Sequence, residues 1–218
     1  MNDLLKPTVT VIVPTTHDRK EFNDRIQKIF DAQDYFPRTI WFDHKDGTIG
    51  EKRNRLCDKA IGPIICHFDD DDLYAPDWIS RSVDALLKSK AQVVGIDNFN
   101  LYENKEGYHT FFRYTAAKTH TPQLAGATLC YLKSFWEQHP FVDRNIGEDV
   151  LFIQNAPKGT VIHSHDYTEG FLCTIHDNNT SKKLTFGSRY RRMEVEEEIE
   201  LMKRWHIGDE NLGPVPGI

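Results

Sequence analysis

The chain has 218 residues, of which 39% are hydrophobic and 28% charged, and its formal net charge at pH 7 is −6 with histidine neutral. This length allows one substantial hydrophobic core, so we expect a single domain. The composition excludes general disorder, and the acidic balance argues against a general polyanion-binding protein.

No apolar run approaches the ~20 residues that a membrane-spanning helix needs, and the N-terminus lacks a charged-then-apolar signal pattern. We therefore expect a cytoplasmic protein without a transmembrane segment. The four cysteines are scattered without a Cys-x-x-Cys pair, which argues against a disulfide framework and against a zinc site.

The first half of the chain alternates strand and helix patterns. Residues 8–13 predict a strand, and Asp18 followed by Glu21 predicts a capping box for a helix ending near Asp34. The patterns that follow predict strands at 39–42, 64–68 and 93–96 and helices at 50–60 and 76–88. This alternation predicts a parallel sheet covered on both faces, with ligands at the carboxyl ends of its strands. We expect Trp41, in the second strand, to lie in the core.

The second half of the chain has a different pattern. Residues 98–102 and 109–114 flank a polar turn and predict an antiparallel hairpin. Later patterns predict strands at 128–132 and 171–175, and helices at 134–139, from Gly147 onward and at 189–205. The last of these helices is amphipathic, and the tail at 208–218 reads as irregular.

Four consecutive aspartates, Asp69 to Asp72, follow the apolar strand at 64–68. Adjacent carboxylates repel one another, so this run destabilises the fold unless a cation or positive side chains lie among them. A hard divalent cation takes oxygen ligands and also binds phosphate oxygens. An isolated acidic run is more often a solvated turn before a helix, but the buried strand before this one and the Tyr-Ala-Pro-Asp-Trp sequence after it favour a metal site.

These motifs, in their order along the chain, resemble those of the GT-A nucleotide-sugar glycosyltransferases, specifically glycosyltransferase family 2. The matching segments are the Val-Ile-Val-Pro-Thr opening, Asp43, residues 52–54, Gly62, the aspartate run with residues 74–77, and residues 147–149. Residues 126–131, 135–136, 175–176 and 179–181 are similar to a small stand-alone bacterial and viral type. The chain departs from the family's usual pattern after Asp43, where His-Lys-Asp-Gly follows.

The resemblance covers residues 8–183 and implies an α/β GT-A fold: one domain with a mostly parallel central sheet, flanking helices, a small antiparallel hairpin region and a C-terminal amphipathic helix. It places the glycosyltransferase domain at residues 1–187, with a nucleotide-binding half at about 8–97 and an acceptor and catalytic half at about 98–187. Residues 188–218 are expected to pack on the same domain as a helix and tail.

The resemblance implies a metal-dependent inverting glycosyltransferase that moves a sugar from a nucleoside-diphosphate sugar, with a UDP-sugar as the first expectation, to an acceptor hydroxyl. The implied cofactor is manganese or magnesium. The acceptor stays open between a glycan, a lipid-linked glycan, a protein and, if the gene is viral, a modified base in DNA.

Individual roles follow from the resemblance, position by position. The implied donor-binding residues are Pro14, Thr15, Arg19, Asp43, Lys52, Arg53, Asp69 and Asp70, with Asp43 contacting the base. The implied metal ligands are Asp69, Asp71 and His176. Asp149 matches the catalytic base, with Glu148 beside it, and the implied acceptor-binding residues are Gly126, Ala127 and Trp136.

Sugar transfer from a nucleoside-diphosphate sugar needs both a cation and a base. Negative charge develops on the departing diphosphate, and a divalent cation there lowers the barrier. The acceptor hydroxyl is a poor nucleophile, so a carboxylate must take its proton, and direct attack inverts the anomeric carbon. Two alternatives remain: a two-metal phosphodiesterase or nuclease, and an inactive nucleotide-sugar binding module. We also expect residues 163–183 to form a lid in which His176 and Lys182 or Lys183 close over the donor.

Overall fold

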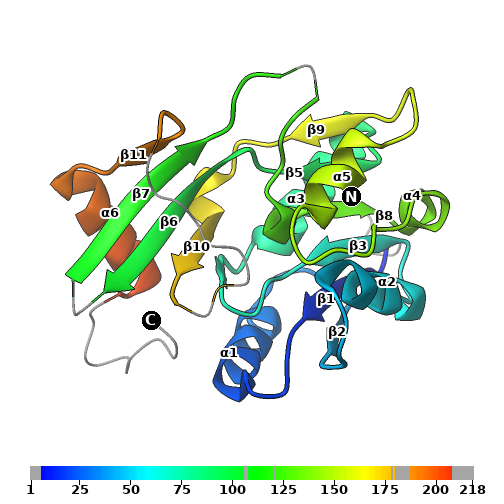
Figure 1. The fold of residues 1–218 in the computed structure, drawn as a ribbon, viewed down its shortest axis with the longest axis horizontal. Helices are drawn as coiled ribbons and strands as arrows, with labels where there is room; N and C mark the ends of the chain where they lie inside the picture. The colour runs from blue at the N-terminus through cyan, green and yellow to red at the C-terminus, as the bar shows by residue number, and fades with distance from the viewer. Residues whose placement is uncertain (1–5, 106–107, 120, 178, 180–186, 208–218) are drawn as a thin grey trace.

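The computed structural model describes residues 6–105, 108–119, 121–177, 179 and 187–207. Its first sheet has six strands in the order β2 (Arg38–Asp43), β1 (Val9–Pro14), β3 (Ile64–His67), β8 (Cys130–Leu132), β5 (Val93–Gly95) and β9 (Ile162–Ser164) (Figure 1). β1 pairs in parallel with β2 and β3, and β5 pairs in parallel with β9. The expected parallel sheet is therefore confirmed for the first half of the chain.

β8 is the exception, because it runs antiparallel between β3 and β5. The chain reaches β8 only after leaving the first sheet for the hairpin, and it returns in the opposite direction through the short turn η2 (Gly126–Thr128). The result is a mixed sheet in which a late segment occupies a central position.

Helices cover both faces of the first sheet. α1 (Lys20–Asp31) and α3 (Trp78–Ser89) pack on the face that presents Val9, Val11 and Val13 of β1. α2 (Ile49–Lys59), α4 (Lys133–Gln138) and α5 (Glu148–Gln154) pack on the other face, against Ile12 of the same strand. The alternation of side chains along β1 thus divides the interior into two apolar layers.

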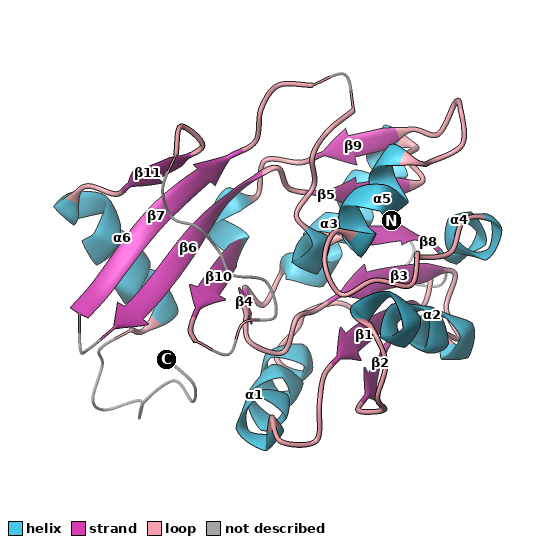
Figure 2. Cartoon of the chain, in the orientation of Figure 1, coloured by secondary structure: helices cyan, strands magenta, loops and turns pink. Residues whose placement is uncertain are grey.

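The second sheet contains the predicted hairpin. Its order is β11 (Tyr190–Arg192), β7 (Tyr108–Thr115), β6 (Asn98–Lys105), β10 (Phe171–Ile175) and β4 (Leu73–Tyr74), and β6 and β7 pair antiparallel as expected. α6 (Val195–Trp205) packs on this sheet through Leu201, against Tyr102 and Phe111. Figure 2 shows the two sheets side by side, with α6 against the second.

Several local predictions differ from the structure. α1 begins at Lys20 with no side-chain cap, so the predicted Asp18–Glu21 capping box is wrong; a capping box occurs instead at Thr48 and Glu51 of α2. The helix predicted from residue 76 begins at Trp78, after the unpredicted strand β4. The predicted helix at 189–205 is divided into β11 and α6, because residues 190–192 pair with β7.

The prediction that Trp41 lies in the core is also wrong. Its side chain is 41% exposed, because β2 is an edge strand that pairs only with β1. The four cysteines are free and buried. Among the described helices, none has the length and apolar character needed to cross a bilayer.

Candidate functional site

A cavity of about 660 Å³ opens at the carboxyl ends of β1 and β3, where the two sheets meet. Twelve of the fifteen site residues singled out from the sequence line it. They are Pro14, Thr15, Arg19, Lys52, Arg53, Asp69, Asp70, Asp71, Gly126, Ala127, Glu148 and Asp149. The exceptions among the described residues are Asp43, Trp136 and His176, so the fold brings most of the predicted site together.

Three of the four consecutive aspartates form a candidate metal centre. Asp69, Asp71 and Asp72 each offer a carboxylate oxygen, and these oxygens lie within 4.8 Å of one another. Asp72 is fully buried and was not predicted as a ligand. An all-oxygen carboxylate cluster is the donor set that Mg²⁺ and Mn²⁺ prefer, so the residues fit the divalent cation that the resemblance implied.

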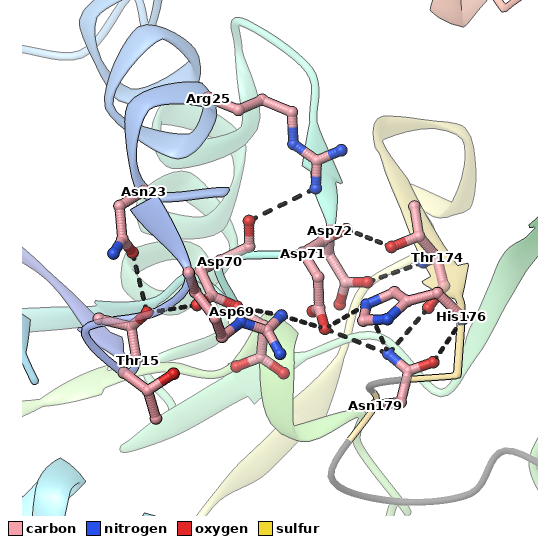
Figure 3. Close-up of polar contacts among 12 residues, drawn as sticks. Thr15, Asn23, Arg25, Asp69, Asp70, Asp71, Asp72, Thr174, His176 and Asn179 are labelled. Atoms are coloured by element: carbon pink, nitrogen blue, oxygen red, sulfur yellow. Dashed lines mark hydrogen bonds and ion pairs between the residues drawn. The ribbon is translucent and has the colours of Figure 1, made fainter. Parts of the chain in front are cut away.

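Asp70 points away from this cluster toward β1 and α1. Its carboxylate accepts a hydrogen bond from the Thr15 hydroxyl and lies 2.8 Å from Arg19 Nη2 (Figure 3). Burial raises the pKa of Asp70 to about 6, and the neighbouring charge of Asp71 acts in the same direction while Arg19 opposes both. Within the run, Asp70 is therefore bound to Thr15 and Arg19, whereas Asp69, Asp71 and Asp72 form the carboxylate cluster.

Asp71 is the point at which three protein donors converge. Its Oδ2 lies 2.8 Å from Arg19 Nη2, 3.0 Å from His176 Nε2 and 3.1 Å from Asn179 Nδ2 (Figure 3). The His176 ring stacks on Phe22 of α1, with centroids 5.3 Å apart. His176 does not line the cavity, but it contacts the proposed metal ligand directly, and Asn179 does both.

Thr174 of β10 forms hydrogen bonds with two members of the acidic run, Asp71 and Asp72. Asp72 Oδ1 accepts a hydrogen bond of 2.8 Å from Thr174 N, and the Thr174 hydroxyl donates to the Asp71 carbonyl. These bonds hold β10, which ends one residue before His176, against the aspartates.

The lid prediction is wrong for most of its length. Residues 163–164 fall in β9, residues 168–170 in the short turn η3 (Thr168–Gly170) and residues 171–175 in β10. Phe171, Leu172 and Cys173 are buried where β10 pairs with β4 and β6. Residues 171–175, which the sequence predicted as a strand, are paired within the second sheet and do not form a lid. Lys182 and Lys183 lie outside the described residues.

Glu148 and Asp149 are adjacent in sequence but have different surroundings. Glu148 is 5% exposed, and its Oε1 accepts a hydrogen bond of 2.5 Å from Arg53 Nη1. Burial raises the pKa of Glu148, and the charge of Arg53 opposes that shift. Arg53 also lies 3.5 Å from Asp69, so it links the first turn of α5 to the acidic run.

Asp149 is partly exposed on the cavity wall, and no ion pair to it occurs among the described residues. Its Oδ1 accepts a hydrogen bond of 2.8 Å from Val150 N. Its Oδ2 lies against Gly126, where an added Cβ would be only 2.2 Å away. Of the two acids, Asp149 is therefore the one whose carboxylate is available to a ligand in the cavity.

Two predicted binding residues do not reach the cavity. Asp43 is 4% exposed, and its oxygens accept hydrogen bonds from Arg55 Nε at 2.6 Å and from Lys45 N at 2.9 Å. Burial acts to raise the pKa of Asp43, but the bonds from Arg55 and Lys45 outweigh it and lower the pKa overall. Trp136 Nε1 donates to Asn54 Oδ1 at 2.9 Å, and its ring packs beside the core that α2 and α5 share. The structure thus gives both side chains structural partners.

Lys52 lines the cavity but is also used within the fold. Its ammonium donates to the Thr15 carbonyl at 2.6 Å and is almost fully buried. It holds the end of β1, where Thr15 meets Asp70.

Some lining residues escaped the sequence analysis. Asp72 was visible as the last member of the acidic run, and Asn179 as part of the Asn-Thr-Ser stretch after His176. Phe99 and Phe171 carried no local signal, because β6 and β10 reach the cavity only through the second sheet.

Comparisons with known proteins bear on the family and on the fold. Residues 7–137 match the family model described as glycosyl transferase family 2. Among solved structures, TarS 1–349 of S. aureus in complex with UDP-GlcNAc aligns with a TM-score of 0.57 at 14% identity, over 90% of this chain and 65% of that one. The mannosyltransferase PcManGT from Pyrobaculum calidifontis, in complex with GDP-Man and Mn²⁺, aligns with a TM-score of 0.56 at 16% identity, over 79% and 57%.

TarS in complex with UDP aligns similarly, with a TM-score of 0.55 at 15% identity over 77% of this chain and 60% of that chain. This chain thus spans about three fifths of the length of the solved structures it matches. A comparison with curated protein sequences finds no match. At these identities the structural likeness establishes the fold, which is the GT-A type that the sequence motifs predicted.

Proposed function

Because this chain belongs to glycosyl transferase family 2, we propose that it is a metal-dependent inverting glycosyltransferase. It moves a sugar from a nucleoside-diphosphate sugar to an acceptor hydroxyl. The observation that carries the proposal is the joint presence, in one cavity, of a three-carboxylate cluster suited to a divalent cation and of a separate carboxylate, Asp149, that is in no described ion pair.

Asp69, Asp71 and Asp72 would hold the cation, with His176 and Asn179 supporting Asp71. When bound, the cation supplies positive charge where the leaving diphosphate develops negative charge. Arg19 lies beside the same carboxylates and adds a second positive group on the diphosphate side of the cavity.

Asp149 takes the proton of the acceptor hydroxyl as that oxygen bonds to the anomeric carbon. The bond between the anomeric carbon and the phosphate oxygen breaks in the same step, and its electron pair leaves with the nucleoside diphosphate. One displacement inverts the configuration at the anomeric carbon. Glu148 cannot share this task, because it is buried in its ion pair with Arg53.

The donor is a nucleoside-diphosphate sugar, and a UDP-sugar is the first candidate. The structural neighbours support this class, since TarS was solved in complex with UDP and with UDP-GlcNAc, and PcManGT in complex with GDP-Man. A contact between Asp43 and the base would use the remaining acceptor sites of a carboxylate that already accepts hydrogen bonds from Arg55 and Lys45.

The proposal is tested by incubating the protein with a panel of UDP-, GDP-, ADP- and dTDP-sugars and Mn²⁺ or Mg²⁺, and measuring release of the nucleoside diphosphate. Nuclease activity on DNA and RNA is measured in parallel. We expect metal-dependent release from one donor class, lost in Asp71→Ala, and no cleavage of nucleic acid. Nucleic-acid cleavage without release from any donor would favour the phosphodiesterase alternative, and binding without turnover would favour an inactive binding module.

A further inference from the structure

Two buried side chains, His67 and Tyr74, connect the cavity wall beside Asp149 with the acidic run, Asp69 to Asp72. The turn η2 lines the cavity beside Asp149, and two of its carbonyls accept side-chain hydrogen bonds. Gly126 O accepts from His67 Nδ1 at 2.8 Å, and Ala127 O accepts from the Tyr74 hydroxyl at 3.0 Å. His67 ends β3 and Tyr74 lies in β4, so the two donors flank the acidic run on both sides.

Tyr74 also contacts the acidic run itself. Its hydroxyl oxygen accepts a hydrogen bond of 2.8 Å from Asp69 N while its proton goes to Ala127 O. The ring is 3% exposed and stacks on Phe68 at 4.0 Å with an interplanar angle of 5°. One rigidly packed oxygen therefore joins the backbone of a proposed metal ligand to the backbone of η2.

The bond from His67 has a fixed direction. Because Gly126 O can only accept, Nδ1 carries the proton, and Nε2 then accepts from the Tyr131 hydroxyl at 2.9 Å. The Tyr131 proton is used in that bond, so the Cys57 thiol, 3.2 Å away, donates to the Tyr131 oxygen. His67, Tyr131 and Cys57 are all at most 1% exposed, and their hydrogen bonds run in one direction toward Gly126.

A buried polar chain of this kind is costly unless every member is satisfied, and apolar side chains could fill the same space. The last acceptor in this series of hydrogen bonds, the Gly126 carbonyl, indicates which part of the site the series positions. Gly126 is the residue against which Asp149 Oδ2 lies, with no room for a Cβ between them. A displacement of the Gly126 carbonyl therefore moves the surface that Asp149 packs on.

We propose that His67 and Tyr74 are positioning residues, which set the place of the Asp149 carboxylate relative to the acidic run through η2. This inference rests on the proposed function, since it concerns the geometry of that reaction. It requires that His67 affect the catalytic step more than donor binding, because its bond reaches only η2. Tyr74 affects both, because it also holds Asp69 N.

The test uses paired variants of the full chain. His67→Leu removes the donor to Gly126 O, whereas His67→Asn places an amide nitrogen where Nδ1 stood and keeps it. Tyr74→Phe removes the second bridge. Tyr102→Phe is the matched control, because it deletes another buried tyrosine hydroxyl, one that bonds to His109 in the second sheet. For each variant we measure kcat and KM for nucleoside-diphosphate release to water, affinity for UDP and GDP with Mn²⁺ by calorimetry, and Tm.

We expect His67→Leu to lower kcat about 10-fold or more, since small misplacements of a reacting group are costly, while KM and nucleotide affinity stay within about twofold of wild type. His67→Asn should recover most of kcat. Tyr74→Phe should lower both kcat and nucleotide affinity, and Tyr102→Phe neither. If His67→Leu does not fold, Tyr131→Phe is used in its place. Tyr131→Phe removes the hydrogen bond to His67 Nε2, so the imidazole is present but no longer held in one orientation.

A wild-type kcat in His67→Leu would overturn the inference. Equal losses in the Leu and Asn variants, or a loss of kcat that follows Tm across all variants including Tyr102→Phe, would also overturn it, because each outcome indicates a contribution to folding alone. A wild-type protein that releases no nucleotide from any donor would refute the proposed function instead.

Discussion

Arg19 and Asp71 form a contact that a metal ion must replace or share. Arg19 Nη2 lies 2.8 Å from Asp71 Oδ2 and 2.8 Å from Asp70 Oδ1, and its guanidinium lies over the Phe22 ring at 4.5 Å. The same Asp71 oxygen receives His176 and Asn179. The guanidinium thus neutralises part of the acidic run, as the sequence required of some cation.

Arg19→Ala should therefore change metal and nucleotide binding in opposite directions. Without nucleotide, Mn²⁺ should bind about threefold or more tightly, because a competing positive charge is removed from the two carboxylates. With UDP or GDP present, nucleotide affinity should fall, because the diphosphate loses a cation. Calorimetric titration measures both, and Lys20→Ala, which removes the exposed charge next along the chain, is the control. Weaker Mn²⁺ binding in Arg19→Ala would contradict this competition.

Asp149→Asn should separate catalysis from binding. The amide cannot take a proton from the acceptor, so turnover should fall by ~10² or more, while affinity for the nucleoside diphosphate with Mn²⁺ stays close to wild type. Turnover assays and calorimetry on the same preparation give the comparison. If affinity were lost and turnover kept, Asp149 would be a binding residue and another group would be the base.

Glu148→Ala should mainly affect stability. It leaves the Arg53 guanidinium, 3% exposed, without its closest carboxylate, and breaking a buried ion pair typically costs about 3–5 kcal/mol. Urea unfolding at pH 7 measures the loss. Asp149→Ala, one residue away and partly exposed, is the matched control and should cost about 1 kcal/mol or less. Equal losses in the two variants would show that the Glu148–Arg53 pair contributes nothing special.

His165 should make the fold sensitive to mild acid. Burial lowers the pKa of His165 to about 4, and the nearby His163 acts in the same direction. Between that value and the ordinary histidine pKa of about 6.5, the unfolded chain binds a proton that the folded chain does not. The free energy of unfolding should therefore fall as pH decreases through this window, by up to about 3 kcal/mol from this residue.

Urea unfolding at several pH values from 7 to 4 tests this. His165→Gln should have a shallower pH dependence than wild type, and the control His163→Gln, which changes an exposed neighbour, should have nearly the wild-type slope. Identical slopes in wild type and His165→Gln would show that His165 is protonated equally in both states.

Local patterns in the sequence were enough to predict the alternating first half, the β6–β7 hairpin and the acidic run, because each depends on residues close together in the chain. Side-chain periodicity determines which face of a strand or helix is apolar, and four adjacent carboxylates demand a compensating charge wherever they lie. The motif order then identified the family and placed Asp149 and Asp71 in one site.

The tertiary structure decided what depends on distant segments meeting. Glu148 forms an ion pair with Arg53, 95 positions away, and Asp43 forms one with Arg55 in the helix that follows it. Neither carboxylate is therefore as free to bind a ligand as its motif implied. The direction of β8 and the bond from His67 to Gly126 follow from the return of the chain through η2. No local pattern records such pairings, because a hydrogen bond or ion pair across the fold depends on positions that only the packed chain fixes.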